Sequence, residues 1–283
     1  MALEPHLVLL VLFAALVHAS WNAVVKSAAE PFLTFTVIHA TGTVLAIFAF
    51  PFVPALDAAA WPYLLVSALV HNGYYVFLLA SYRAGDLSQI YPVARGTAPL
   101  LVAVGAALFA GEVPGPWGLA GLVIASGGIM GLALAKGWPA KDARKPLMLA
   151  LLTALFISTY TVLDGLGIRS TASAFSFIVW LNFLEGIPFT LWALTMRRRD
   201  VVPFLKVHWR WGCFGGVLTM VAYGCALYAL SQGAMAFVAA LRETSVLFAV
   251  LIGCLLLKEP FGRSRLLAAG AIVTGVIVLQ VWG

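Results

Sequence analysis

Five charged residues interrupt long apolar stretches of the sequence, where a charge is costly: Arg95, Asp164, Glu185, Arg242 and Glu243. An arginine in the middle of a membrane-spanning helix costs about 2.5–3.5 kcal/mol on insertion scales, so each must face a cavity or a partner. Arg95 and Arg242 could therefore bind a substrate carboxylate. The alternative is a structural ion pair of either arginine with Glu243 or Glu185. Arg242 and Glu243 are adjacent and point about 100° apart on a helix, so they are not expected to pair with each other.

The three acidic residues of this set suggest proton chemistry. An apolar environment disfavours the charged form of a carboxylic acid, so Asp164, Glu185 or Glu243 could carry a proton and couple transport to a proton gradient. The alternative for Asp164 is simple hydration, because it lies near the end of its apolar stretch.

Aromatic and polar side chains recur in the same stretches. His71, Tyr74, Tyr75 and Leu78 share one helical face, and Tyr91 shares a face with Arg95. Aromatic walls with a few polar tips suit an amphipathic organic solute. The alternative is that these rings lie at the lipid headgroups. The candidate substrate-binding residues are His18, Trp21, Asn22, His71, Tyr75, Tyr91, Arg95, Tyr160, Tyr223 and Arg242.

Enzyme and metal signatures are missing from the sequence. His18, His39 and His71 are 21 and 32 residues apart, which fits no metal motif, and the three cysteines form no CxxC pair. The chain contains no HExxH, GxSxG or GxxxxGK[ST] motif. We therefore expect no catalytic residue, no metal, no cofactor and no direct use of ATP.

The composition requires lipid around most of the chain. Of 283 residues, 63% are hydrophobic and 10% are charged, and the mean hydropathy is +1.01. A soluble fold of this size cannot bury so much apolar surface. The pattern predicts an all-α membrane protein with ten spans. They are roughly 5–26, 32–54, 61–83, 87–110, 115–136, 146–167, 173–196, 209–231, 235–257 and 264–282.

The two halves of the sequence resemble each other at rare polar positions. A shift of 147 residues places Arg95 on Arg242, Thr97 on Thr244 and Glu112 on Glu259. Five spans per repeat is an odd number, so the second copy would enter the membrane inverted. Inverted repeats are typical of secondary transporters. We predict a first repeat over 1–138 and a second over 139–283.

Basic residues predict the orientation. Loops after odd-numbered spans hold 14 of the 17 Lys and Arg, whereas loops after even-numbered spans hold Arg169 alone. The positive-inside rule then places both termini outside the cytoplasm, on the periplasmic side of a bacterial inner membrane. Membrane lipid accounts for the net charge of +6, so no nucleic-acid partner is expected.

Two further features concern the helix ends and bends. Pro92 and Pro99 interrupt the fourth predicted span and could act as hinges, whereas the ninth span contains no proline. Glu112 and Glu259 follow spans four and nine, and we expect them to interact with the N-termini of spans five and ten in a structural or gating role.

Three segments carry a family resemblance. They are HASWNAVVKSA at 18–28, LFAGEVPGPWGLAGLVIASGGIMGL at 108–132 and LLLKEPFGRSRLLAAGAIVTGVIVL at 255–279. The sequence resembles EamA-type transporters of the drug/metabolite transporter superfamily over its whole length. The resemblance implies a basket of ten helices, with a cavity lined mainly by spans 1, 3, 4, 6, 8 and 9 and with peripheral spans 5 and 10. Many members are thought to keep both termini in the cytoplasm, which differs from the orientation that the charges predict.

The sequence therefore predicts a secondary transporter that exports small organic metabolites by alternating access. Amino acids, including aromatic ones, are the first candidate cargo, as in one branch of the family it resembles. A multidrug or other metabolite carrier is the alternative, and an intramembrane enzyme, a channel or a receptor fits less well. We expect a monomer or a weak homodimer.

Overall fold

A computed structural model of the chain describes residues 2–26, 28, 30–84, 87–134, 144–256 and 263–283, to which all structural statements below refer. The described residues form helices and connecting turns without any strand. The helices are α1 (Pro5–Lys26), α2 (Pro31–Ala49), α3 (Trp61–Ala84), α4 (Leu87–Ala110), α5 (Pro116–Leu134), α6 (Arg144–Arg169), α7 (Ala174–Met196), α8 (Arg198–Gln232), α9 (Met235–Arg242), α10 (Ser245–Leu256) and α11 (Arg263–Val281). Two short 3₁₀ turns, Phe50–Phe52 and Ala58–Ala60, lie between α2 and α3.

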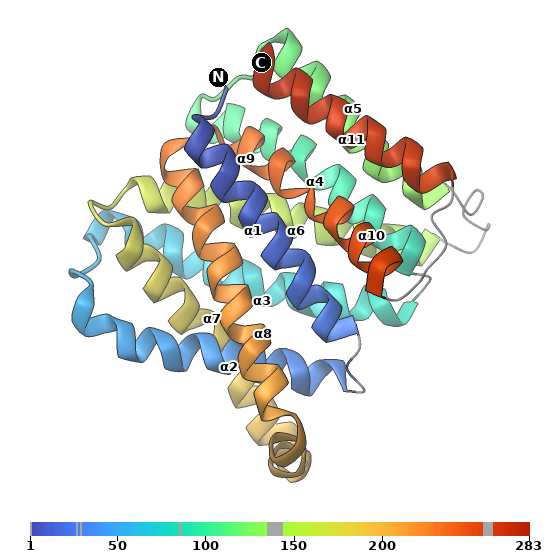
Figure 1. Ribbon diagram of the computed structural model, residues 1–283. Coiled ribbons are helices and arrows are strands. Elements are labelled where there is room, and N and C mark those ends of the chain that lie inside the picture. Colours follow the sequence, from blue (N-terminus) through green and yellow to red (C-terminus); the bar gives the residue numbers. More distant parts are fainter. Residues whose placement is uncertain (1, 27, 29, 85–86, 135–143, 257–262) are drawn as a thin grey trace.

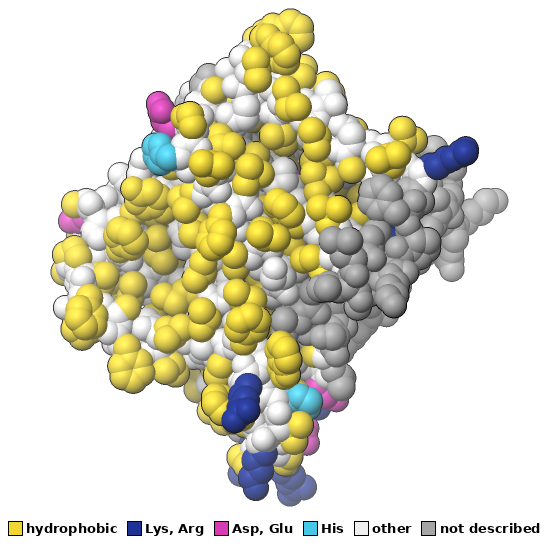
Figure 2. Space-filling view, viewed as in Figure 1, with side chains coloured by type: hydrophobic (Ala, Val, Ile, Leu, Met, Phe, Trp, Pro, Cys, Tyr) yellow, Lys and Arg dark blue, Asp and Glu magenta, His cyan; other side chains and the backbone are white. Residues whose placement is uncertain are grey.

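The prediction of an all-α membrane protein is confirmed. Nine segments of the described chain are long and apolar enough to cross a membrane, and the ninth predicted span is shared by α9 and α10. The third predicted span corresponds to α3, which is not one of these nine segments. It has 24 residues but carries His71, Asn72, Tyr74 and Tyr75 in its middle. In Figure 2, hydrophobic side chains are spread over the described part of the visible face, as expected for a surface in contact with lipid.

Helix α8 is longer than predicted. It starts at Arg198 and runs for 35 residues, so the predicted loop before residue 209 is helical. At 1.5 Å per residue it exceeds the roughly 30 Å of a hydrocarbon core, so one end must project beyond it. The projecting end carries exposed Arg198, Arg199, Lys206 and Arg210, and dark-blue side chains gather at this end of the molecule in Figure 2. Both chain termini lie at the opposite end of the bundle (Figure 1).

Pro92 and Pro99 lie inside α4, which is a single helix, and their role as hinges stays a prediction. The proline-free ninth span is divided instead, at Glu243 and Thr244. There the backbone N–H groups of Glu243, Thr244, Val246 and Leu247 donate to carbonyls three residues back, which is the tighter 3₁₀ pattern. Arg242 therefore lies at the end of a half-helix.

Small residues hold α5 against α11, and the two helices lie side by side at one edge of the bundle in Figure 1. A Cβ atom at Gly121 would lie 2.7 Å from the carbonyl oxygen of Gly275, and one at Gly275 would lie 2.5 Å from the nitrogen of Ala125. Without the hydrophobic effect as a driving force between helices in lipid, such close backbone contact supplies the packing energy.

We predict that Gly121→Val destabilises the protein. Overpacking costs about 1–3 kcal/mol, and the upper end applies here because the obstructing atoms belong to a backbone. Gly127 of the same helix is a matched control, because a Cβ there meets no atom within 4 Å. Thermal unfolding in detergent should show a lowered Tm for Gly121→Val and the wild-type Tm for Gly127→Val. Equal Tm values would contradict the proposed contact.

Candidate functional site

A cavity of about 50 Å³ lies inside the bundle, and we call it the central cavity. Seven helices line it: α1, α2, α3, α6, α7, α8 and α9. The lining residues are His18, Trp21, Ile38, His39, Gly42, His71, Tyr74, Tyr75, Tyr160, Asn182, Glu185, Gly216, Thr219, Met220, Tyr223 and Arg242. The family resemblance implied a wall that included span four and did not name spans two and seven; instead α2 and α7 contribute to it and α4 does not.

The structure brings most of the predicted binding residues to this wall. His18, Trp21, His71, Tyr75, Tyr160, Tyr223, Arg242 and the predicted proton carrier Glu185 line the cavity. Asn22, Tyr91 and Arg95 do not. Asn22 donates its side-chain N–H to the carbonyl of His18 one turn back on the same helix, at 2.9 Å. Tyr74 was placed on the helical face of His71 and Tyr75 but was not selected as a binding residue. Asn182 and Thr219 were not predicted, because single polar residues in a span carry no distinguishing pattern.

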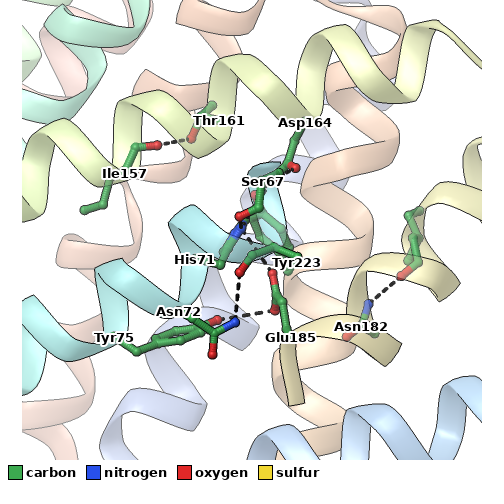
Figure 3. Close-up of polar contacts among 12 residues, drawn as sticks. Ser67, His71, Asn72, Tyr75, Ile157, Thr161, Asp164, Asn182, Glu185 and Tyr223 are labelled. Carbon is green, nitrogen blue, oxygen red and sulfur yellow. Dashed lines mark hydrogen bonds and ion pairs between the residues drawn. The ribbon is translucent and has the colours of Figure 1, made fainter. Parts of the chain in front are cut away.

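A polar network connects three helices beside the cavity (Figure 3). Asp164 on α6 is fully buried, so the alternative of a hydrated Asp164 is wrong. Its two carboxylate oxygens accept hydrogen bonds from the hydroxyl of Ser67 on α3, at 2.5 Å, and from the hydroxyl of Tyr223 on α8. Two hydroxyl donors satisfy an ionised carboxylate, which can only accept. Ser67 was not predicted, because nothing in the sequence links it to a residue 97 positions away.

His71 connects this network to Glu185 on α7. The Nδ1 atom of His71 lies 3.0 Å from the carbonyl oxygen of Ser67 and 3.3 Å from Oε1 of Glu185. Both neighbours are acceptors, so we assign the imidazole hydrogen to Nδ1. The Nε2 atom lies 3.9 Å from Oδ2 of Asp164, and the ring stacks on Tyr160 with centroids 3.8 Å apart. His71 thus lies between two buried acids.

Arg95 forms the structural ion pair that was considered as the alternative to substrate binding. Its Nε atom lies 2.8 Å from Oε2 of Glu243, and both side chains are buried. The guanidinium also donates to the hydroxyl of Ser245 at 3.3 Å and lies 5.9 Å from the ring centroid of Tyr91. The charge of Arg95 is therefore neutralised inside the protein.

Arg242, at the corresponding position of the second half, is in a different environment. Within the described part of the chain it has no carboxylate at ion-pair distance, and its guanidinium lies 5.0 Å from the ring centroid of Tyr223. Glu243, its neighbour in sequence, pairs with Arg95 instead, and the prediction that Arg242 and Glu243 do not pair with each other is confirmed. Arg242 therefore presents a positive charge to the cavity without an acidic partner.

Glu112 contacts a different helix from the one predicted. Glu112 follows Gly111, which ends α4 with a φ of 68°. One of its carboxylate oxygens accepts from the backbone N–H of Met235 at the start of α9, at 2.7 Å, and not from the N-terminus of α5. The other pairs with Arg169 at the end of α6, which also donates to the carbonyls of Leu230 and Gly233. The pair therefore joins the ends of four helices. Glu259 lies outside the described residues.

The described residues contain no group of three or more His, Cys, Asp or Glu side chains arranged to hold a metal ion. The chemistry of the site is that of charged and aromatic groups around a small cavity. It can bind an organic solute through ion pairs, hydrogen bonds and ring contacts.

Comparison with known proteins agrees with this architecture. Residues 144–281 match the EamA-like transporter family. The fold matches a solved crystal structure with a TM-score of 0.79 over 98% of this chain and 97% of the other, at 19% sequence identity. That identity supports the fold alone. The second half of the chain therefore matches the EamA-like transporter family, and the whole chain shares its helical fold with that solved structure.

Proposed function

We propose that the protein is a secondary carrier that exports small organic solutes bearing a carboxylate, with amino acids, including aromatic ones, as the first candidates. The observation that carries this proposal is Arg242, which faces the central cavity without an acidic partner among the described residues. A guanidinium binds a carboxylate through two parallel hydrogen bonds. A cargo carboxylate would neutralise a charge that is otherwise costly at this depth.

The remaining wall favours an amine and an aromatic group on the same cargo. Glu185 supplies a negative charge to the cavity, and Trp21, Tyr75 and Tyr160 supply ring surfaces. An α-amino acid combines a carboxylate, an ammonium group and a side chain within a few bonds. Organic amines without a carboxylate, as in multidrug carriers, are the second candidate because Glu185 alone could hold them.

The size of the cavity favours a conformational cycle. Ligand pockets usually measure about 300–1,000 Å³, whereas the central cavity of about 50 Å³ holds only a few water molecules. The helices must separate for an amino acid to enter. This requirement is consistent with alternating access, in which the site opens to one side at a time.

Helix pairing supports two related halves that move against each other. α1 packs on α8 and α3 packs on α6, while α2 packs on α7 and α5 packs on α11. In the proposed repeats, α1 corresponds to α6, α2 to α7, α3 to α8 and α5 to α11. Exchanging the two halves therefore converts the α1–α8 pair into the α3–α6 pair, and it leaves the α2–α7 and α5–α11 pairs unchanged. This is the pairing expected of the proposed repeats 1–138 and 139–283, whose boundary lies outside the described residues.

The distribution of charge supports the proposed orientation. The exposed basic residues at the start of α8 lie far from the chain termini (Figure 1). With this end in the cytoplasm, both termini face the periplasm of a bacterial inner membrane.

Counterflow in proteoliposomes tests the function. Vesicles are loaded with one unlabelled amino acid, and entry of the same labelled amino acid is followed at equal pH and ionic conditions on both sides. A carrier should give a transient, saturable accumulation that empty vesicles lack. A panel of amino acids and of amines without a carboxylate separates the two candidate cargo classes. No counterflow for any member of the panel would overturn the proposal.

A further inference from the structure

We propose that Glu185 is a proton-binding site in the central cavity, and that a proton and the ammonium group of the cargo occupy it alternately, so that one is exchanged for the other across the membrane. This inference rests on the proposed transport function and adds the coupling ion and the residue that binds it. Among the described residues, the apolar spans contain three acids, Asp164, Glu185 and Glu243, and only Glu185 fits this role.

Asp164 is held as a carboxylate by its surroundings. Both of its oxygens accept hydrogen bonds from hydroxyl groups, those of Ser67 and Tyr223. If Asp164 were protonated, one of its oxygens would carry a hydrogen. That oxygen would lose its hydroxyl donor, or the hydroxyl would have to turn and accept the hydrogen instead. The side chain is fully buried and does not belong to the wall of the central cavity, so cargo has no direct access to it.

Glu243 is held as a carboxylate by a permanent cation. Its Oε2 atom lies 2.8 Å from Nε of Arg95, and both side chains are buried. Arginine stays protonated in proteins, so a neutral Glu243 would leave the Arg95 charge unpaired in the apolar interior. Glu243 does not line the central cavity either.

Glu185 differs from both in its contacts. It is 94% buried, it lines the cavity, and its Oε1 atom receives no hydrogen bond. Oε2 accepts only a long hydrogen bond of 3.4 Å from the hydroxyl of Tyr75. The contact of Oε1 with His71 Nδ1, at 3.3 Å, competes with the carbonyl of Ser67 for the same hydrogen. A carboxylate with such weak partners in a buried site is the one that a proton stabilises most.

The net charge of the ionisable residues inside the spans also identifies Glu185 as the proton-binding acid. Among the described spans, Arg95 and Arg242 contribute two positive charges, and Asp164 and Glu243 contribute two negative charges. Glu185 would add an uncompensated negative charge while the histidines are neutral. A proton on Glu185 makes this sum zero in the empty cavity. The ammonium group of a bound amino acid neutralises Glu185 locally in place of the proton, while the cargo carboxylate pairs with Arg242. Only one of the two is needed, so each displaces the other.

The groups that face Glu185 come from each helix packed around it. They are His39 on α2, His71 and Tyr75 on α3, Asp164 on α6 and Tyr223 on α8. None of them is an arginine or a lysine, and Arg242, which lines the same cavity from α9, forms no ion pair with Glu185 in the described structure. When the cavity opens to the cytoplasm, the cargo ammonium would replace the proton, which leaves to the cytoplasmic water. When it opens to the other side, a proton from that side would bind Glu185 and release the ammonium.

Infrared spectroscopy of the purified protein tests the proton site without any cargo. Near pH 7 exposed Asp and Glu residues are ionised, so a carbonyl band of a protonated carboxylic acid reports a buried neutral acid. We expect this band in the wild type and in the surface control Glu4→Gln, and we expect its loss in Glu185→Gln. A band that persists in Glu185→Gln, or a wild type without the band, would overturn the proposal.

Transport of labelled L-phenylalanine into proteoliposomes tests the coupling. The readout is the ratio of uptake with an acidic lumen to uptake at equal pH, which does not depend on the absolute rate of a variant. We expect a ratio several-fold above one for the wild type and Glu4→Gln, partial retention in Glu185→Asp, and a ratio of about one in Glu185→Gln. A wild-type ratio of one, or a wild-type-like ratio in Glu185→Gln, would overturn the coupling while leaving the carrier function intact. If the wild type transports neither phenylalanine nor any other amino acid, the proposed function fails, and the infrared band alone decides whether Glu185 binds a proton.

Discussion

Replacing Arg242 with glutamine is expected to reduce amino acid counterflow by about 30-fold or more at a cargo concentration below saturation. Removing one partner of a buried, hydrogen-bonded charge pair costs about 2–5 kcal/mol, and each 1.4 kcal/mol corresponds to tenfold in affinity. Arg242→Lys should recover only part of the loss, because an ammonium group cannot form the paired hydrogen bonds of a guanidinium. The measurement is the concentration dependence of counterflow.

The matched control for this prediction is Arg263→Gln. Arg263 is an exposed arginine at the start of α11, so its loss should leave counterflow near the wild-type value. Arg242→Gln should also melt no lower than the wild type, since it removes a half-buried charge that has no acidic partner in the described structure. Equal effects of the two substitutions on transport would show that Arg242 does not hold the cargo.

Replacing Arg95 with leucine is expected to destabilise the fold by about 3–5 kcal/mol, because it leaves the buried carboxylate of Glu243 without its cation. The double variant Arg95→Leu/Glu243→Leu should recover most of that stability, since removing both charges together leaves neither unpaired. Thermal or denaturant unfolding of the purified variants in detergent measures both effects.

An exposed ion pair provides the control for this cycle. Arg197 pairs with Asp200 at 2.6 Å, but both side chains are roughly half exposed. Arg197→Ala should therefore leave the stability nearly unchanged. If Arg95→Leu costs as little as Arg197→Ala, or if Arg95→Leu and Glu243→Leu destabilise additively, the Arg95–Glu243 pair is not the structural element that the geometry indicates.

The sequence could predict the number and placement of most helices, because hydropathy adds up along a local stretch of chain. It did not predict the extent of α8 beyond the bilayer, because a polar helical extension lacks the apolar signal that marks a span. It also gave no sign of the helix break at Glu243 and Thr244, which falls in a span without proline, whereas α4 stays a single helix around Pro92 and Pro99. A proline only removes one backbone donor, and α4 accommodates two of them, whereas the turn after Arg242 depends on contacts with the surrounding helices.

The candidate site was predicted in part for a related reason. A charged or aromatic residue in an apolar span is conspicuous in the sequence, so Glu185, His71 and Arg242 could be selected. The partners of these residues could not, because Ser67, Asp164 and Tyr223 meet only when α3, α6 and α8 pack together. Glu112 was correctly expected at a helix N-terminus, but its choice of α9 over the adjacent α5 depends on the tertiary arrangement of the loop ends.

The sequence by itself determined that the protein is helical, that lipid surrounds it and that a few charges remain inside at an energetic cost. These are properties of composition and local periodicity, which the bilayer converts directly into spanning helices. Only the tertiary structure decided the roles of those charges. Arg95 and Arg242 correspond in the two halves of the sequence, yet Glu243 neutralises Arg95 and leaves Arg242 facing the cavity. The physical reason is that an ion pair needs two groups within about 4 Å, and residues distant in the chain reach that distance only through the packing of helices.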